Sequence, residues 1–133
     1  MRRNLFEMDI AVRWRDMDAF NHVNNASYLG YIEEARVAWF KKLSESWVSE
    51  SAAPILAAIT VNYRRPANWP ETVRVELFTE RLGNKSLTLG HRIHSASEPG
   101  VLYADGNAVM VWVDRDGQSV LLPAAVRGAC SVP

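Results

Sequence analysis

The chain has 133 residues, of which 48% are hydrophobic and five are tryptophan. This length and apolar content suit one folded domain over residues 1–133 and exclude a disordered chain. Fifteen Lys and Arg residues balance fifteen Asp and Glu residues, so net charge gives no support for binding to nucleic acid or to an anionic membrane.

The N-terminal end begins Met1-Arg2-Arg3-Asn4 and continues with alternating rather than continuous hydrophobicity. We therefore expect no signal peptide and no membrane-spanning segment, and hence a soluble cytoplasmic protein. Cys130 is the only cysteine, which excludes an intramolecular disulfide and a cysteine-rich metal site. It is predicted to be a bystander thiol in an irregular C-terminal tail.

The first predicted element is a strand over residues 6–14. Its apolar residues follow a strict period of two, which indicates one buried face: Phe6, Met8, Ile10, Val12 and Trp14. Residues 15–25 then lose this period and collect Asp, Asn and His. They are predicted to form a functional loop ahead of a helix.

A helix is predicted over residues 26–43, where bulky apolar residues recur every three or four positions: Tyr28, Tyr31, Ile32, Ala35, Trp39 and Leu43. Asn24 or Asn25 can cap its first turn through the side-chain oxygen. Charged residues occupy the opposite face, so the helix should lie against a sheet with one side in water: Glu33, Glu34, Lys41 and Lys42.

After a polar connection at 44–54, four more strands are predicted, at 55–65, 72–82, 86–97 and 102–113. The short turn-forming segments between them favour antiparallel neighbours. Residues 120–133 suit an edge strand or a short helix. One long helix cannot cover both faces of a sheet, so we expect a sheet wrapped around that helix, with its uncovered surface buried by a second copy.

Segment 14–28 holds the candidate chemistry, since it combines Asp16 and Asp18 with His22 and three asparagines. The start of a helix offers unpaired N–H groups and a positive dipole end, which can stabilise a carbonyl oxygen that gains negative charge. A nearby carboxylate can attack the carbonyl carbon or activate a water. A thioester has a good leaving group, so these two devices suffice for its hydrolysis, although the spacing alone does not fix the reaction.

Two runs of sequence resemble a known family. DAFNHVNNASY at 18–28, continued by EEAR at 33–36, resembles the signature of hotdog-fold acyl-CoA thioesterases of the 4-hydroxybenzoyl-CoA thioesterase-like branch, most of all the bacterial long-chain members. VNYRRPA at 61–67 is also similar to theirs. The resemblance implies an α+β hotdog fold, with an antiparallel sheet wrapped around one long central helix. It also implies homodimers joined edge to edge, often paired into homotetramers, with active sites at subunit interfaces.

By motif position, the family's catalytic aspartate falls on Asp18 rather than Asp16, and the backbone N–H that polarises the thioester carbonyl falls near Asn25. The turn at Lys85 and Ser86 resembles the family's position for CoA contact. The 4-hydroxybenzoyl-specific enzymes carry glycine and an apolar residue where this chain has Asn21 and His22. This departure favours an aliphatic acyl group over an aryl one.

Other candidates follow from side-chain chemistry. Arg64 and Arg65 can bind CoA phosphates or neighbouring carboxylates, although an alternating strand sends them to opposite faces. His22 can assist Asp18 or position water, or it can simply orient the loop. His91 and His94 are interpreted as packed or exposed histidines.

Each candidate also has a plainer structural role. Asp18 can close a turn by accepting backbone N–H groups, Asn24 and Asn25 can be caps, and Tyr28 can be a core residue. Asp16 is expected to be structural and to pair with Arg13 or Arg15. Glu33 and Glu34 are expected in solvent, and they are reserve candidates because a related hotdog branch uses a helix glutamate as base.

The sequence thus predicts hydrolysis of a medium- or long-chain acyl-CoA to a free acid and CoA, with no cofactor. A metal site built from Asp16, Asp18 and His22 is not expected, because three ligands on one loop lack a distant partner motif. Three alternatives stay open. They are a non-catalytic acyl-CoA-binding hotdog module, a thioesterase that acts on acyl-carrier protein, and a hotdog dehydratase or hydratase, whose paired histidine and acid motif is not found.

Overall fold

The computed structural model describes residues 4–43, 47–49 and 51–131. The first three residues and parts of the predicted segments 44–54 and 120–133 lie outside the described residues. The elements in chain order are β1 (Asn4–Ala11), the 3₁₀ turn η1 (Trp14–Asp16), α1 (Asn25–Lys41), β2 (Ala53–Tyr63), β3 (Thr72–Leu82), β4 (Ser86–Ser95), β5 (Leu102–Val113) and α2 (Ala124–Ser131).

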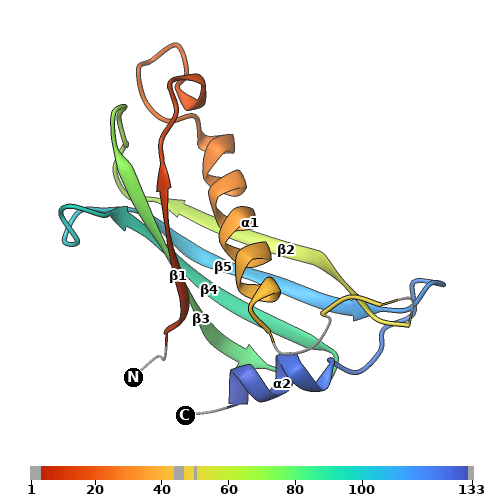
Figure 1. The fold of residues 1–133 in the computed structure, drawn as a ribbon. Helices are drawn as coiled ribbons and strands as arrows, with labels where there is room; N and C mark the ends of the chain where they lie inside the picture. Colours follow the sequence, from red (N-terminus) through yellow and green to blue (C-terminus); the bar gives the residue numbers. More distant parts are fainter. Residues whose placement is uncertain (1–3, 44–46, 50, 132–133) are drawn as a thin grey trace.

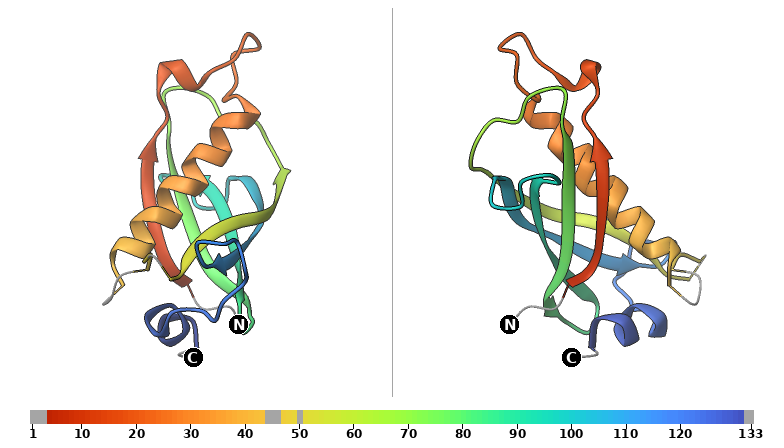
Figure 2. Two further views of the ribbon diagram at one scale, coloured as in Figure 1. Left: turned by 90° about the vertical axis from the view of Figure 1, so that its right-hand side faces the viewer. Right: turned by 60° about the vertical axis from the view of Figure 1, so that its left-hand side comes forward.

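Within the described residues, five strands form one antiparallel sheet in the order β1-β3-β4-β5-β2. The long helix α1 lies along one face of this sheet and packs mainly against β1 and β3 (Figures 1 and 2). The predicted α+β architecture, a curved sheet around one long helix, is therefore confirmed. Apolar side chains from α1 and from the inner face of the sheet fill the space between them.

The predicted first strand ends early, at Ala11 rather than Trp14. Val12 is buried as expected, but the Trp14 side chain is 70% exposed, so its predicted place on the buried face is wrong. The Asp16 carboxylate accepts the Arg13 backbone N–H at 2.9 Å, which turns the chain into η1. This local hydrogen bond ends the strand, although the apolar alternation continues.

The predicted long helix is confirmed as α1, which begins at Asn25. Asn24 caps it, because the Asn24 Oδ1 accepts the Ala26 N–H at 2.9 Å. Glu33 and Glu34 are exposed, as predicted. Arg36 is the exception to the pattern, since it lies on the buried face and is 6% exposed.

The bounds of β3 and β5 are those predicted. The strand β4 ends two residues early, and β2 both begins and ends two residues before its predicted bounds, so it takes in the end of the predicted connection at 44–54. The C-terminal segment forms the helix α2 and not an edge strand. Cys130 lies in this helix, so its predicted place in an irregular tail is wrong. The Arg127 Nη2 donates to the Gly83 carbonyl at 2.6 Å, which ties α2 to the β3–β4 turn.

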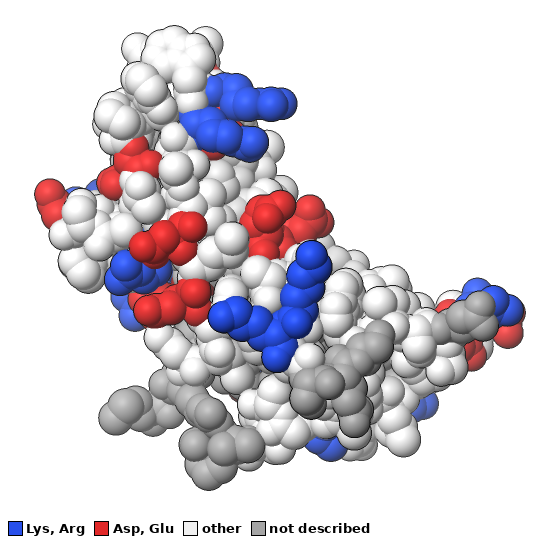
Figure 3. Space-filling view, in the orientation of Figure 1, with Lys and Arg blue, Asp and Glu red and all other residues white. Residues whose placement is uncertain are grey.

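The strand β2 forms one edge of the sheet, and large apolar side chains are exposed along it and along the outer side of α1. They are Leu29 (42%), Val37 (37%), Ile55 (50%), Leu56 (44%) and Tyr63 (46%). On the face shown in Figure 3, acidic and basic side chains form small separate groups. None of the described helices is both long and apolar enough to cross a membrane.

Candidate active site

Two loops meet at the start of α1, one at residues 12–24 and one at residues 64–71. The Val12 N–H donates to the Glu71 carbonyl at 2.8 Å, and the Val23 N–H donates to the Ala67 carbonyl at 2.9 Å. Between these contacts, the His22 Nδ1 lies 2.9 Å from the Asn68 Oδ1. Residues 46 positions apart in the sequence thus share one surface.

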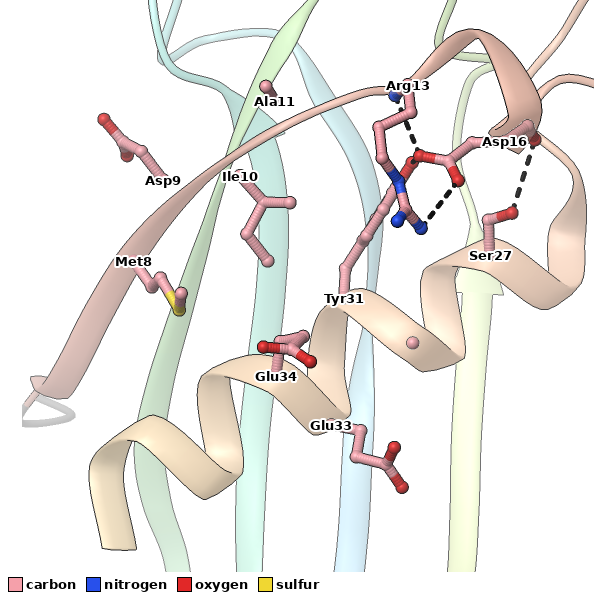
Figure 4. A pocket seen from close by; sticks show the side chains of 11 residues that line it. Met8, Asp9, Ile10, Ala11, Arg13, Asp16, Ser27, Tyr31, Glu33 and Glu34 are labelled. Atoms are coloured by element: carbon pink, nitrogen blue, oxygen red, sulfur yellow. Dashed lines mark hydrogen bonds and ion pairs between the residues drawn. The ribbon is translucent and has the colours of Figure 1, made fainter. Parts of the chain in front are cut away.

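Asp16 anchors the first loop to the helix. Its carboxylate is 5% exposed and accepts the Arg13 N–H, the Arg13 Nη2 at 3.1 Å and the Tyr31 hydroxyl at 2.7 Å (Figure 4). Its carbonyl accepts the Asn24 N–H at 2.8 Å and the Ser27 Oγ at 3.3 Å. Burial alone would raise the pKa of Asp16, but the hydrogen bonds from Arg13 and Tyr31 hold it below its usual range. The predicted structural role and the pairing with Arg13 are confirmed.

A helix terminus leaves backbone N–H groups without partners in the helix, and at the start of α1 most of these groups are bonded locally. The Asn24 side chain accepts a hydrogen bond from the Ala26 N–H, and the Asn24 carbonyl accepts one from the Ser27 N–H at 2.8 Å. Within the described chain, no hydrogen bond engages the N–H of Asn25, the first helical residue. The Asn25 carbonyl accepts the Tyr63 hydroxyl at 3.0 Å, which fixes the helix start against β2.

Asp18 closes a tight turn over residues 18–22. Its Oδ1 accepts the Phe20 N–H at 2.8 Å and the His22 N–H at 3.4 Å, and its own N–H donates to the His22 carbonyl at 2.9 Å. Asn21 takes a positive φ of 62°. The plainer role of Asp18 is therefore present in the structure. Among the described residues, its Oδ2 accepts no hydrogen bond, so one carboxylate oxygen stays available for chemistry.

The same turn occurs a second time, at Asp114. The Asp114 Oδ1 accepts the Asp116 and Gln118 N–H groups, both at 2.9 Å, and the Asp114 N–H donates to the Gln118 carbonyl at 2.9 Å. Gly117, with a φ of 80°, stands where Asn21 stands in the first turn. Turn formation alone thus does not distinguish Asp18 from Asp114, and the difference between them lies in the residues that surround each turn.

Asp18 lines a hollow of about 630 Å³ that the two loops form together. Such a volume lies in the usual range of small-ligand sites. Its walls combine apolar and polar side chains: Trp14, Met17, Asp18, Asn21, His22, Asn68 and Trp69. His22 therefore lies beside Asp18, but its ring bonds Asn68 and only its backbone bonds the Asp18 carboxylate.

The sequence did not single out Asn68 or Trp69, because both follow the recognised run at 61–67. Trp69 precedes a cis proline, Pro70. The X-Pro pair marks a turn, yet nothing in it indicates which distant loop that turn will meet.

The other predicted residues are spread more widely. Tyr28 is 2% exposed and packs edge-on against the Tyr63 ring, so its core role is the one observed. Arg64 forms an ion pair with Asp105 at 3.0 Å, and Arg65 is exposed.

Lys85 and Ser86 lie at the β3–β4 turn, at the end of β3 away from the two loops. Eleven residues of β3 separate the two ends, or roughly 33 Å at the rise of a strand. Within one chain, Lys85 and Ser86 therefore do not join Asp18.

The reserve carboxylates Glu33 and Glu34 line a separate hollow of about 580 Å³ between β1 and α1 (Figure 4). This hollow shares no lining residue with that of Asp18. Within residues 4–43, 47–49 and 51–131, no group of three His, Cys, Asp or Glu side chains is placed to hold a metal ion.

Comparisons with known proteins agree with this architecture. The long-chain acyl-CoA thioesterase FadM of Escherichia coli is 32% identical over 117 residues, which cover 86% of this chain and 88% of FadM. The solved structure of a Thermus thermophilus thioesterase, complexed with coenzyme A and Zn, is 34% identical with a TM-score of 0.82 over 96% of this chain and 98% of that one. A solved Pseudomonas aeruginosa protein is 40% identical with a TM-score of 0.90, over 96% and 98% of the two chains. The model of the thioesterase-like superfamily matches residues 12–130, and the chain belongs to this superfamily, with the hotdog fold expected of it.

Proposed function

We propose that the protein hydrolyses acyl-CoA thioesters to a carboxylic acid and free CoA. The observation that carries this proposal is the hollow in which Asp18 keeps one oxygen free, in the loop that leads to the Asn25 N–H at the start of α1. The names of two relatives, a long-chain acyl-CoA thioesterase and a thioesterase with bound coenzyme A, support the same reaction.

In this scheme Asp18 acts as nucleophile or as general base. Its Oδ1 is held by two backbone N–H groups, so the carboxylate keeps a fixed position while its Oδ2 reacts. The carboxylate oxygen, or a water oxygen that Asp18 deprotonates, bonds to the carbonyl carbon. The backbone N–H of Asn25 stabilises the charge that develops on the carbonyl oxygen. The C–S bond then breaks, and CoA leaves as a thiolate that takes up a proton. Where water attacks, the free acid forms in this step; where Asp18 attacks, the step leaves an anhydride between Asp18 and the acyl group, which a water molecule hydrolyses to release the acid and regenerate the carboxylate.

His22 would have an orienting role, because its contact with Asn68 joins the two walls of the hollow. The acyl group would be a medium or long aliphatic chain. Arg65 is better placed than Arg64 to meet CoA phosphates, since Arg64 is already paired with Asp105. The carrier is CoA in this proposal, with acyl-carrier protein as the alternative.

A second copy of the chain would complete the site. Lys85 and Ser86 reach a ligand at Asp18 only if another copy supplies them. The open edge of β2 and its exposed apolar residues suit such a contact, which gives a homodimer and, by pairing of dimers, a homotetramer.

The test is Asp18→Asn against the matched control Asp114→Asn, which changes the same turn away from the hollow. Thiol release from dodecanoyl-CoA should fall by about a hundredfold or more in Asp18→Asn and stay at the wild-type rate in Asp114→Asn. Both variants should lose a similar, small amount of stability, because both turns keep an oxygen acceptor. Equal turnover by the two variants would refute Asp18 as the catalytic carboxylate. Binding of dodecanoyl-CoA by the wild type without thiol release would favour a non-catalytic binding module.

A further inference from the structure

Two indole side chains form an exposed corner beside Asp18. Trp14 is 70% exposed and Trp69 is 44% exposed, and their ring centroids lie 5.2 Å apart with the planes at 82°. Tryptophans expose this much surface in few places on a soluble protein, and clustered ones usually mark a binding site. The backbone contacts of Val12 and Val23 with the second loop hold the corner together.

This corner faces the hollow of Asp18. Trp14, Met17 and Trp69 supply its apolar walls, and the polar side chains, including Asp18 and His22, supply the rest. A ligand that fits both parts has a reactive polar end next to an apolar body. An acyl thioester has this form, with its carbonyl at one end and its hydrocarbon at the other.

The charge of the hollow indicates which part of an acyl-CoA lies there. Its lining contains one carboxylate and, among the described residues, no Lys or Arg. CoA phosphates need cationic partners, so this lining does not suit the nucleotide end. The core of the protomer is also closed to an acyl chain, because side chains such as Ile32 and Leu89 fill it at 1% exposure each.

We therefore infer that Trp14 and Trp69 form the acyl-binding wall of the Asp18 hollow and determine the selectivity of the enzyme for bulky apolar acyl groups. This inference rests on the proposed function. An alkyl chain can lie across both indoles, and a flat ring can stack on one and meet the edge of the other. An acetyl group has little apolar surface to place against the indoles, so it should gain little from them.

The kinetic test compares Trp14→Ala and Trp69→Ala with Phe20→Ala. Phe20 is an 80% exposed aromatic residue on the same loop whose side chain does not line the hollow, and alanine keeps its backbone N–H. For dodecanoyl-CoA or benzoyl-CoA, kcat/KM should fall about tenfold or more in each tryptophan variant, while the value for acetyl-CoA stays within about twofold. Phe20→Ala should keep the wild-type ratio between the substrates. The two bulky substrates distinguish an aliphatic acyl group from an aryl one.

A binding test separates this inference from the proposed reaction. In the Asp18→Asn background, calorimetry with dodecanoyl-CoA should show about tenfold weaker binding when Trp69 becomes alanine, whereas binding of free CoA should not change. Equal losses for dodecanoyl-CoA and free CoA would overturn the inference, because the indoles would then hold the nucleotide. Unchanged selectivity in both tryptophan variants, or the same loss in Phe20→Ala, would also overturn it. If the wild type hydrolyses no thioester but the binding difference persists, the reaction fails and the acyl site stands.

Discussion

Replacing Asp16 by alanine should destabilise the protein, mainly because the buried Tyr31 hydroxyl loses its hydrogen-bond acceptor. The Asp16 carboxylate accepts the hydrogen bond of the Tyr31 hydroxyl. Because Tyr31 is 4% exposed, water cannot easily replace the carboxylate as acceptor. A buried donor left without a partner costs about 1–3 kcal/mol. The two Arg13 donors add about 1 kcal/mol together, because the Arg13 side chain is 64% exposed and water can solvate it. The expected loss is therefore about 3 kcal/mol, roughly a hundredfold in the ratio of folded to unfolded protein.

Urea unfolding followed by circular dichroism, at one fixed protein concentration, measures this loss. Tyr31→Phe should cost less, about 1 kcal/mol, because the Asp16 carboxylate keeps its Arg13 donors. The double variant should be more stable than the sum of the single losses predicts, since no hydroxyl is then left unpaired. The exposed Asp116, changed to alanine, is the control. Wild-type stability of Asp16→Ala, or full additivity in the double variant, would refute this account.

The same carboxylate should contribute to acid sensitivity. The pKa of Asp16 is lower in the folded protein than in the unfolded chain, so the unfolded chain binds the proton more readily. Its contribution is present above about pH 4 and is lost as the pH falls further. Wild-type and Asp16→Ala proteins should therefore converge in stability in acid, and a constant gap between them down to about pH 2 would contradict this.

Three further predictions concern the sheet. Gly106→Ala should lower the free energy of unfolding in urea by more than about 2 kcal/mol. The φ of Gly106 is 152°, and an added Cβ would lie 1.9 Å from the Thr60 carbonyl oxygen. A smaller loss would mean that β2 moves aside. Burial holds the pKa of His91 below its usual range, so the free energy of unfolding should fall as the pH drops below about 6.5. In His91→Gln this pH dependence should be lost, as unfolding measured between about pH 5 and 8 would show. Leu56→Glu, in the edge strand β2, should convert the oligomer to a monomer, which light scattering would show as a lower mass in solution. Leu121→Glu, at a site that is 67% exposed, is the control and should leave the mass unchanged. A monomeric wild type would contradict the proposed assembly.

Local sequence patterns determined most of the fold. The strand-like runs at 72–82 and 102–113, with the turn-forming segments that bound them, predicted both bounds of β3 and of β5, because strand and turn preferences depend on neighbouring residues. The three- and four-residue spacing defined α1 in the same way. The motif at 18–28 indicated the family, and the match over residues 12–130 confirmed it.

Tertiary structure decided what surrounds those residues. Trp14 continues the alternation of β1 but is exposed, because Asp16 turns the chain before it. Asn68 and Trp69 become walls of the Asp18 hollow only through hydrogen bonds that join two loops 46 residues apart. Asp18 and Asp114 close the same turn, and only Asp18 lines the hollow between the two loops. A turn depends on a few adjacent residues, whereas a binding site depends on which distant segments pack together, and that contact has no local pattern.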